Sequence, residues 1–158
     1  MERIGSCTNV QDGRATLPDI GGMIYETKTA LILRQGMPTW QIANVAAFLA
    51  GGLAGTHPHL MGEPYKGGDG RAYTGLIREP VFVYGATVEE LRRTHQRALS
   101  RALVPAVYIE AMFTTTNDAD NRAAFAAAPV DTLDFVGIGV HGARKTIDKI
   151  VNSLRFLS

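Results

Sequence analysis

The chain has 158 residues, of which 46% are hydrophobic and 20% charged, and its net charge is +1. This composition is typical of a globular protein, and the small net charge excludes an overall field that would attract nucleic acid or an anionic membrane. The single Cys7 excludes an internal disulfide and a multi-cysteine metal site. No apolar run reaches the roughly 18 residues that span a bilayer. These features predict a cytoplasmic protein with no membrane partner.

Residues 1–24 are polar and contain several glycines, with no apolar segment of the kind found in a signal peptide. We interpret them as an N-terminal extension whose role the sequence does not reveal. Residues 25–158 then form one α/β domain, which is large enough to bury a substantial core.

The stretch from Thr27 to Gly55 predicts a strand, a tight corner and a helix. The unbroken aliphatic run Ala30 to Leu33 indicates a buried strand. Thr39, after Pro38, is placed as the N-cap of a helix that begins near Trp40. This helix is expected to pack on the sheet through residues at helical spacing, namely Ile42, Val45, Ala46, Leu49 and Leu53.

A second face of the same helix carries Gln41, Asn44 and Phe48. If this face borders a cleft, its two amides lie beside the carboxyl end of the strand, where open α/β folds bind their ligands. The alternative is a solvated shoulder with Phe48 half buried.

Further along the chain, strands and helices alternate. Residues 55–80 are expected to form a long loop that carries a small hairpin around residues 66–70. Strands are predicted over 81–84, 106–109 and 134–140, and helices over 87–102, 117–128 and 143–157. Thr87 and Glu90 form a capping box, and Asn117 caps the next helix. The pattern predicts a three-layer domain with a sheet of about four strands and helices on both faces.

The sequence Gly137-Ile-Gly139-Val-His-Gly142 matches the G-x-G-x-x-G dinucleotide-binding pattern. Its first two glycines fall inside the predicted strand rather than in the turn after it, and too little chain follows for the rest of such a fold. We interpret them as glycines that let a helix pack closely on the strand.

The histidines are the candidate metal ligands of this chain. His57 and His59 flank a proline in a loop with Glu63 nearby, but they share no fixed face and no fourth ligand is evident. We therefore predict no metal and no other cofactor. His95 lies on the packed face of its helix and is expected to be a core histidine. His141, at the carboxyl end of the last strand, is a candidate ligand-binding residue.

The strongest chemical grouping follows the strand 106–109. Glu110 is a candidate general base, and the hydroxyls of Thr114 and Thr115 come just before the helix capped by Asn117. A purely structural alternative is an ion pair between Glu110 and an arginine such as Arg122.

Several segments together resemble the type II peptidyl-tRNA hydrolase superfamily. They are KTALILR, GMPTWQIANVAAFLAGGL, VFVYGATVEELRRTHQRAL, VYIEAMFT and DFVGIGVHGARKTIDKIVNSLRFL, which follow one another in the order of that family's strands and helices. The chain is most similar to a branch of small uncharacterised proteins in the superfamily. The resemblance covers about Lys28 to Leu157, makes the last two strands antiparallel neighbours, and implies a homodimer.

The departures from that family bear on function. Gln41 occupies the place of an essential lysine, and Glu110 that of an aspartate. The loss of positive charge at the corner makes a tRNA substrate possible but not favoured. The resemblance implies Glu110, Gln41 and Thr114 as candidate catalytic residues. The candidate ligand-binding residues are Trp40, Asn44, Phe48, Phe113, Thr115, Asn117 and His141.

Three functions remain open. The cleft between Gln41 and Glu110 binds or hydrolyses an unidentified small ligand, with Glu110 as base and Gln41 as donor. A second possibility is true peptidyl-tRNA hydrolysis with Gln41 in place of the lysine. The third is a non-catalytic binding module in which Trp40, Phe48 and Phe113 form an apolar pocket.

Overall fold

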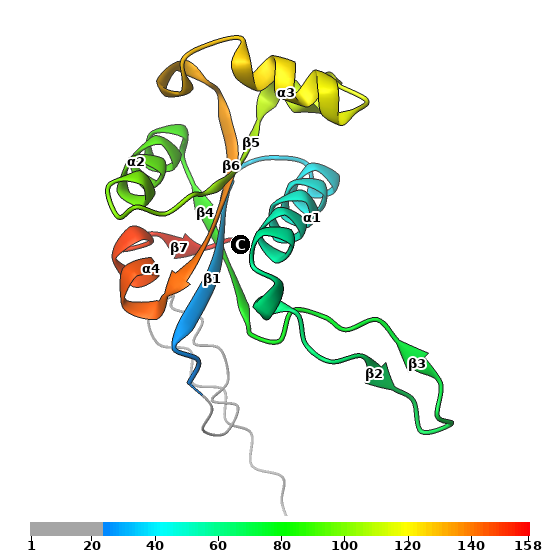
Figure 1. The fold of residues 1–158 in the computed structure, drawn as a ribbon. Coiled ribbons are helices and arrows are strands. Elements are labelled where there is room, and N and C mark those ends of the chain that lie inside the picture. Colours follow the sequence, from blue (N-terminus) through cyan, green and yellow to red (C-terminus); the bar gives the residue numbers. More distant parts are fainter. Residues whose placement is uncertain (1–23) are drawn as a thin grey trace, which may run out of the picture.

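The computed structural model describes residues 24–158, so the predicted extension lies almost wholly outside the described residues. A five-stranded sheet with the order β5-β6-β1-β4-β7 runs through the domain (Figure 1). Neighbours β1 and β4 are parallel, and the other neighbouring pairs are antiparallel. The mixed sheet and the antiparallel last two long strands were expected. Its strands are β1 (Thr27–Arg34), β4 (Val81–Ala86), β5 (Ala106–Ile109), β6 (Phe135–Ala143) and β7 (Arg155–Phe156).

The fifth strand was missed because the last helix is shorter than predicted. Helix α4 covers only Arg144–Ile150, and Ser153 then takes a φ of 78°, which turns the chain back toward the sheet. Residues Arg155–Phe156 pair with the edge of β4, and the ring of Phe156 stacks on Tyr84 at 5.0 Å. The apolar residues near the terminus therefore serve an edge strand, although their spacing also suits a helix.

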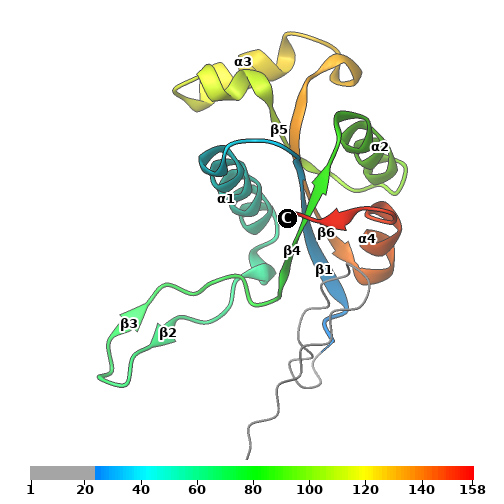
Figure 2. The same cartoon turned by 180° about the vertical axis from the view of Figure 1, so that it is seen from behind.

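Helices cover both faces of the sheet. Helix α1 (Thr39–Thr56) lies on one face, and α2 (Val88–Leu99) and α4 lie on the other, as Figures 1 and 2 show. The buried residues of α1 are Val45, Leu49 and Leu53, all from the predicted face. Thr39 is not the N-cap, because the helix already begins there and Pro38, with φ fixed near −56°, precedes it.

Close packing explains the glycines of β6. A Cβ on Gly137 would lie 2.6 Å from Val45 Cγ1, and one on Gly139 would lie 3.1 Å from Leu53 Cδ1. Both contacts come from α1, so the glycines let this helix approach the sheet, as the sequence indicated.

Helix α2 begins with the predicted capping box between Thr87 and Glu90. His95 is buried and lies 4.9 Å from the ring of Phe135, so it is the expected core histidine. The helix ends at Leu99, which is half exposed, and the chain leaves it through Ala102 with a φ of 56°. The predicted end of this helix at residue 102 is therefore wrong, because α2 ends about one turn earlier.

The remaining elements surround the two ends of α1. The short helix η1 (Pro58–Leu60) follows α1, and the predicted hairpin, β2 (Tyr65–Lys66) with β3 (Ala72–Tyr73), extends away from the domain (Figure 1). At the other end lie η2 (Glu110–Thr114), α3 (Asp118–Ala126) and η3 (Val130–Thr132). Asn117 caps α3 as predicted. None of the helices described for residues 24–158 is long and apolar enough to cross a membrane.

Candidate functional site

The direction of the strands divides the candidate residues between the two opposite ends of the strands. Strands β1 and β5 are both antiparallel to β6, so their carboxyl ends lie at the opposite end of the sheet from the carboxyl end of β6. Glu110 and the start of α1 lie at the carboxyl ends of β1 and β5, whereas His141 lies near the carboxyl end of β6. Helix α1 has 18 residues and is therefore about 27 Å long, which separates the two groups. The structure thus does not bring His141 to the cleft in which the sequence placed it.

A cleft lies between α1 and the segment formed by η2 and α3. It consists of two adjoining hollows of about 340 and 470 Å³ that share five lining residues, within the size range of small-ligand sites. Trp40, Asn44, Phe48, Phe113, Thr115 and Asn117, all predicted from sequence, line the smaller hollow together with Tyr108, Met112, Thr116, Asp118 and Asn121.

Four aromatic rings form a continuous row along this cleft. The ring centroids of Trp40 and Phe113 are 5.9 Å apart, those of Phe113 and Tyr108 5.2 Å, and those of Tyr108 and Phe48 5.6 Å. Trp40 is 62% exposed and Phe48 57% exposed. The row therefore presents open aromatic surface that a ligand would cover.

The polar groups of the cleft carry little net charge. Asn44 donates a hydrogen bond to the Tyr108 hydroxyl at 3.3 Å. Burial raises the pKa of Tyr108, so this hydroxyl is protonated at neutral pH. Asp118 is paired with Arg122 at 2.7 Å on the exposed side of α3. Thr116 and Asn117 add further neutral donors and acceptors at the edge.

The predicted catalytic residues lie apart from this cleft lining. Glu110 is paired with Arg34, which also contacts Asp134 at 3.3 Å. The Thr114 hydroxyl donates to the backbone carbonyl of Ala111. Gln41 and Thr114 are absent from the residues that line either hollow among residues 24–158. The ion pair predicted as the structural alternative for Glu110 exists, but with Arg34 rather than Arg122, because Arg122 bonds to Asp118.

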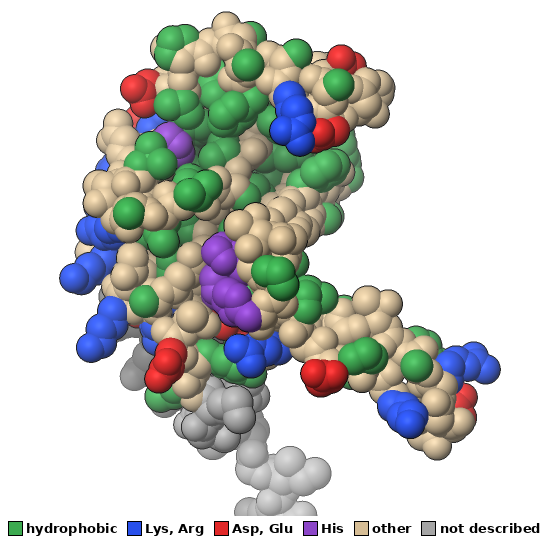
Figure 3. Space-filling model, viewed as in Figure 1, with side chains coloured by type: hydrophobic (Ala, Val, Ile, Leu, Met, Phe, Trp, Pro, Cys, Tyr) green, Lys and Arg blue, Asp and Glu red, His purple; other side chains and the backbone are tan. Residues whose placement is uncertain are grey.

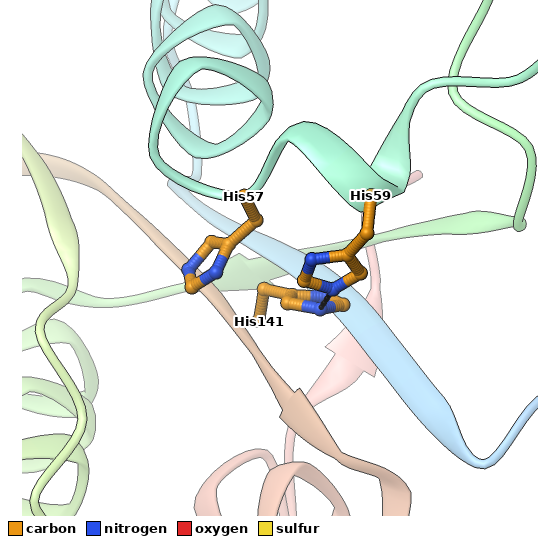
Figure 4. Close-up of side chains that lie close together, drawn as sticks. All are labelled: His57, His59 and His141. Atoms are coloured by element: carbon orange, nitrogen blue, oxygen red, sulfur yellow. Dashed lines mark hydrogen bonds between the residues drawn. The ribbon is translucent and has the colours of Figure 1, made fainter.

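Three histidines come together at the other end of α1. His57 directly follows α1, His59 lies in η1, and His141 projects from β6. One nitrogen from each ring lies within 4.8 Å of those of the other two, and the Nε2 atoms of His59 and His141 are 3.1 Å apart (Figure 4). Figure 3 shows histidine side chains gathered at the surface beside α1. A group of this kind is a candidate metal-binding site.

A buried carboxylate stands behind this histidine cluster. Glu79 Oε1 lies 3.3 Å from His141 Nδ1, and the side chains of both residues are at most 3% exposed. Thr29 donates to Glu79 Oε1 at 2.7 Å and lies 3.0 Å from His141 Nδ1, while Thr27 donates to Oε2 at 2.7 Å. Burial lowers the pKa of His141, and His57 and His59 lower it further, whereas Glu79 opposes the shift.

Comparison with known proteins shows which family shares this fold. Residues 27–158 match the family model described as Protein of unknown function (DUF2000). The chain belongs to this family. A solved structure, that of the protein of unknown function Atu0240 from Agrobacterium tumefaciens strain C58, is 38% identical with a TM-score of 0.82, covering 85% of this chain and 100% of the other. No curated protein matches the chain.

Sequence reasoning about this DUF2000 chain missed residues at both ends of α1. Tyr108 reaches the cleft from within strand β5, and its apolar neighbours in the sequence gave no sign of a site. Glu79 has a clearer signal, because it lies two residues before a strand of the sheet and a carboxylate that is buried there needs polar partners. Its partners, however, lie 50 and 62 residues away in the sequence.

Proposed function

We propose that this protein binds a small, uncharged ligand containing a planar ring in the cleft between α1 and α3. The observation that carries the proposal is the row of four aromatic rings, from Trp40 to Phe48, which lines the same hollow as several hydroxyl and amide side chains. Rings of this kind favour edge-to-face and offset contacts with a planar ligand. The side-chain amides and hydroxyls would fix its orientation.

The charges around the cleft favour a neutral ligand. Asp118 is matched by Arg122, and Glu110 by Arg34, so no uncompensated charge of these pairs faces the hollow. A charged ligand would have to exchange its hydration for contacts with neutral side chains, which is costly. A neutral ring system loses little hydration and gains aromatic contact.

A binding role is better supported than hydrolysis. Glu110 is engaged by Arg34, and Thr114 donates to its own short helix, so neither is aimed at a bound ester. Kinship with the type II peptidyl-tRNA hydrolase superfamily remains part of the proposal, supported by the strand, corner and helix of residues 27–56. Peptidyl-tRNA hydrolysis is kept as a second candidate because Asn44, three residues after Gln41 on α1, is hydrogen-bonded to the Tyr108 hydroxyl in the cleft.

Tryptophan fluorescence tests the binding proposal, because Trp40 is the chain's only tryptophan and lines the cleft. Titration with adenosine and with nicotinamide is expected to give a saturable change in emission with at least one of the two compounds. Phe113→Ala should weaken that binding about fivefold to tenfold, since an aromatic contact contributes roughly 1 kcal/mol. Tyr73→Ala is the matched control, because Tyr73 is an exposed aromatic residue in the hairpin.

Equal affinities in Phe113→Ala and the unchanged protein would contradict the cleft assignment. Incubation with an N-blocked aminoacyl-tRNA provides the test of the second candidate. Release of the amino acid above the rate in buffer, reduced by Glu110→Gln, would support hydrolysis instead of simple binding.

The homodimer implied by the family resemblance also remains a proposal. Exposed apolar residues on the described part of the chain, among them Leu76 and Val104, give it surface to use. Light scattering at several protein concentrations would reveal a dimer, whereas a monomer mass throughout would remove it.

A further inference from the structure

The histidine cluster lies at the far end of α1 from the proposed ligand cleft and plays no part in it. We propose that His57, His59 and His141 bind one divalent transition-metal ion, with Zn²⁺ as the best match. The site is assembled from two segments, since His59 and His141 are 82 residues apart in the chain. The first observation behind the proposal is that one nitrogen of each imidazole lies within 4.8 Å of those of the other two.

The spacing of the ring nitrogens fits shared coordination. Ligands held 2.0–2.1 Å from a tetrahedral metal are separated from one another by about 3.3 Å. The Nε2 atoms of His59 and His141 already lie 3.1 Å apart. The widest separation in the cluster, 4.8 Å, has to close by roughly 1.5 Å. Rotation of the half-buried His57 side chain would supply this movement.

The hydrogen bonds of His141 hold its ring in the orientation that a metal requires. Thr29 uses its one proton to bond Glu79, so it accepts a hydrogen bond from Nδ1 of His141. Nδ1 therefore carries the ring proton, and the lone pair of Nε2 points toward His59. In metal sites, a ligating histidine is usually held by a carboxylate at its other ring nitrogen in this way, which fixes the orientation of the ring.

Glu79 supplies the second, independent observation. Its carboxylate is almost completely buried, yet its partners among residues 24–158 are two hydroxyls and the imidazole of His141, with no lysine or arginine within 4.0 Å. A buried anion normally has a cationic partner, because its desolvation is costly. A dication on the outer side of His141 would provide the opposing charge.

The ligand set also indicates the type of ion and the openness of the site. Imidazole nitrogens suit zinc, copper, nickel and cobalt rather than calcium or magnesium, which prefer oxygen. Three protein ligands leave at least one position of a zinc ion for water or an added molecule. Because His59 is exposed, that position would face solvent.

Titration of the untagged full chain with Zn²⁺ in a calorimeter tests the proposal, with metal content measured after dialysis. One ion per chain is expected. His59→Ala should weaken binding by about 100-fold or more, because it removes a ligand. Since the His59 side chain is exposed, this substitution should not unfold the protein. Glu79→Gln should weaken binding about 10- to 100-fold, because it removes the carboxylate that holds the His141 ring.

Two controls separate this cluster from other donors. His95→Gln removes the remaining histidine, which is buried against Phe135, and should leave zinc affinity unchanged. Cys7→Ser, at a position outside the described residues, should also leave it unchanged. Substitution of Co²⁺ should give visible absorption bands that disappear in His59→Ala. The proposal would be overturned if His59→Ala still bound one zinc ion with the affinity of the unchanged protein. It would also be overturned if the unchanged protein bound zinc no more tightly than His59→Ala does.

Discussion

The Nε2 atoms of His59 and His141 lie 3.1 Å apart, although four strands and two α-helices separate these residues in the chain. The contact exists because β6 runs antiparallel to β1 and delivers His141 to the edge of the sheet where α1 ends. Behind it, Thr29 and Glu79 complete a buried polar group that faces the core on one side and the histidine cluster on the other.

The buried hydrogen bonds among Thr29, Glu79 and His141 should stabilise the folded protein even without metal. In the presence of a chelator, Thr29→Val is expected to lower the free energy of unfolding by about 2–3 kcal/mol, because it removes a hydrogen bond to a buried carboxylate at nearly constant volume. Urea unfolding measures the change. Thr74→Val, at an exposed position, should stay within about 0.5 kcal/mol of the unchanged protein. Similar values for the two variants would contradict the assigned role of Thr29.

Two glycine-to-alanine substitutions should change the stability of the protein in opposite directions. Gly137→Ala should destabilise the protein by about 1–3 kcal/mol, because the new methyl group would overlap Val45 and Leu49. Gly51→Ala, within α1 and with no atom within 4 Å of the added group, should stabilise it by about 0.5–1 kcal/mol. Denaturant melts of both variants test the close packing of α1 on β6, and a neutral Gly137→Ala would argue against it.

Helix capping at α2 gives a local prediction. Thr87→Ala removes the side-chain acceptor for the backbone N–H of Glu90 and should cost about 1 kcal/mol. Glu90→Ala should cost less, because the backbone N–H of Thr87 that its carboxylate caps is at an exposed position and water can replace the bond. Thermal unfolding of the two variants compares the halves of the capping box. A larger loss for Glu90→Ala would contradict this ranking.

His95 predicts a dependence of stability on pH. Burial lowers the pKa of His95 in the folded protein, while Asp131 opposes the shift. The unfolded chain therefore binds the proton more readily than the folded protein. The folded protein thus becomes less stable as the pH falls through about 6.5, the ordinary histidine pKa. His95→Gln should reduce this loss between pH 7.5 and 5.5 in urea titrations. Parallel pH profiles for both proteins would show that His95 does not contribute.

Local pattern was sufficient for much of the fold. The spacing of Val45, Leu49 and Leu53 identified the buried face of α1, and the capping residues Thr87 and Asn117 located the starts of two helices. These signals act between residues close in sequence, where propensity and periodicity decide the structure. The last helix and β7 were misassigned because Phe156 is held by pairing with distant β4.

The candidate sites depended on contacts that local pattern does not contain. The aromatic residues Trp40, Phe48 and Phe113 were predicted to meet, and they do line one cleft. His57 and His59 gave no metal prediction because their third partner, His141, arrives through the antiparallel direction of β6. Without the order and directions of the strands, no spacing rule joins these residues.

Diffraction from crystals of the full chain grown with Zn²⁺, measured on both sides of the zinc absorption edge, tests the metal site most directly. We expect an anomalous peak about 2.0–2.1 Å from one ring nitrogen of each of His57, His59 and His141, with Glu79 hydrogen-bonded behind His141. Absence of a peak at this position at a saturating zinc concentration, or a zinc ion bound only by other residues, would contradict it.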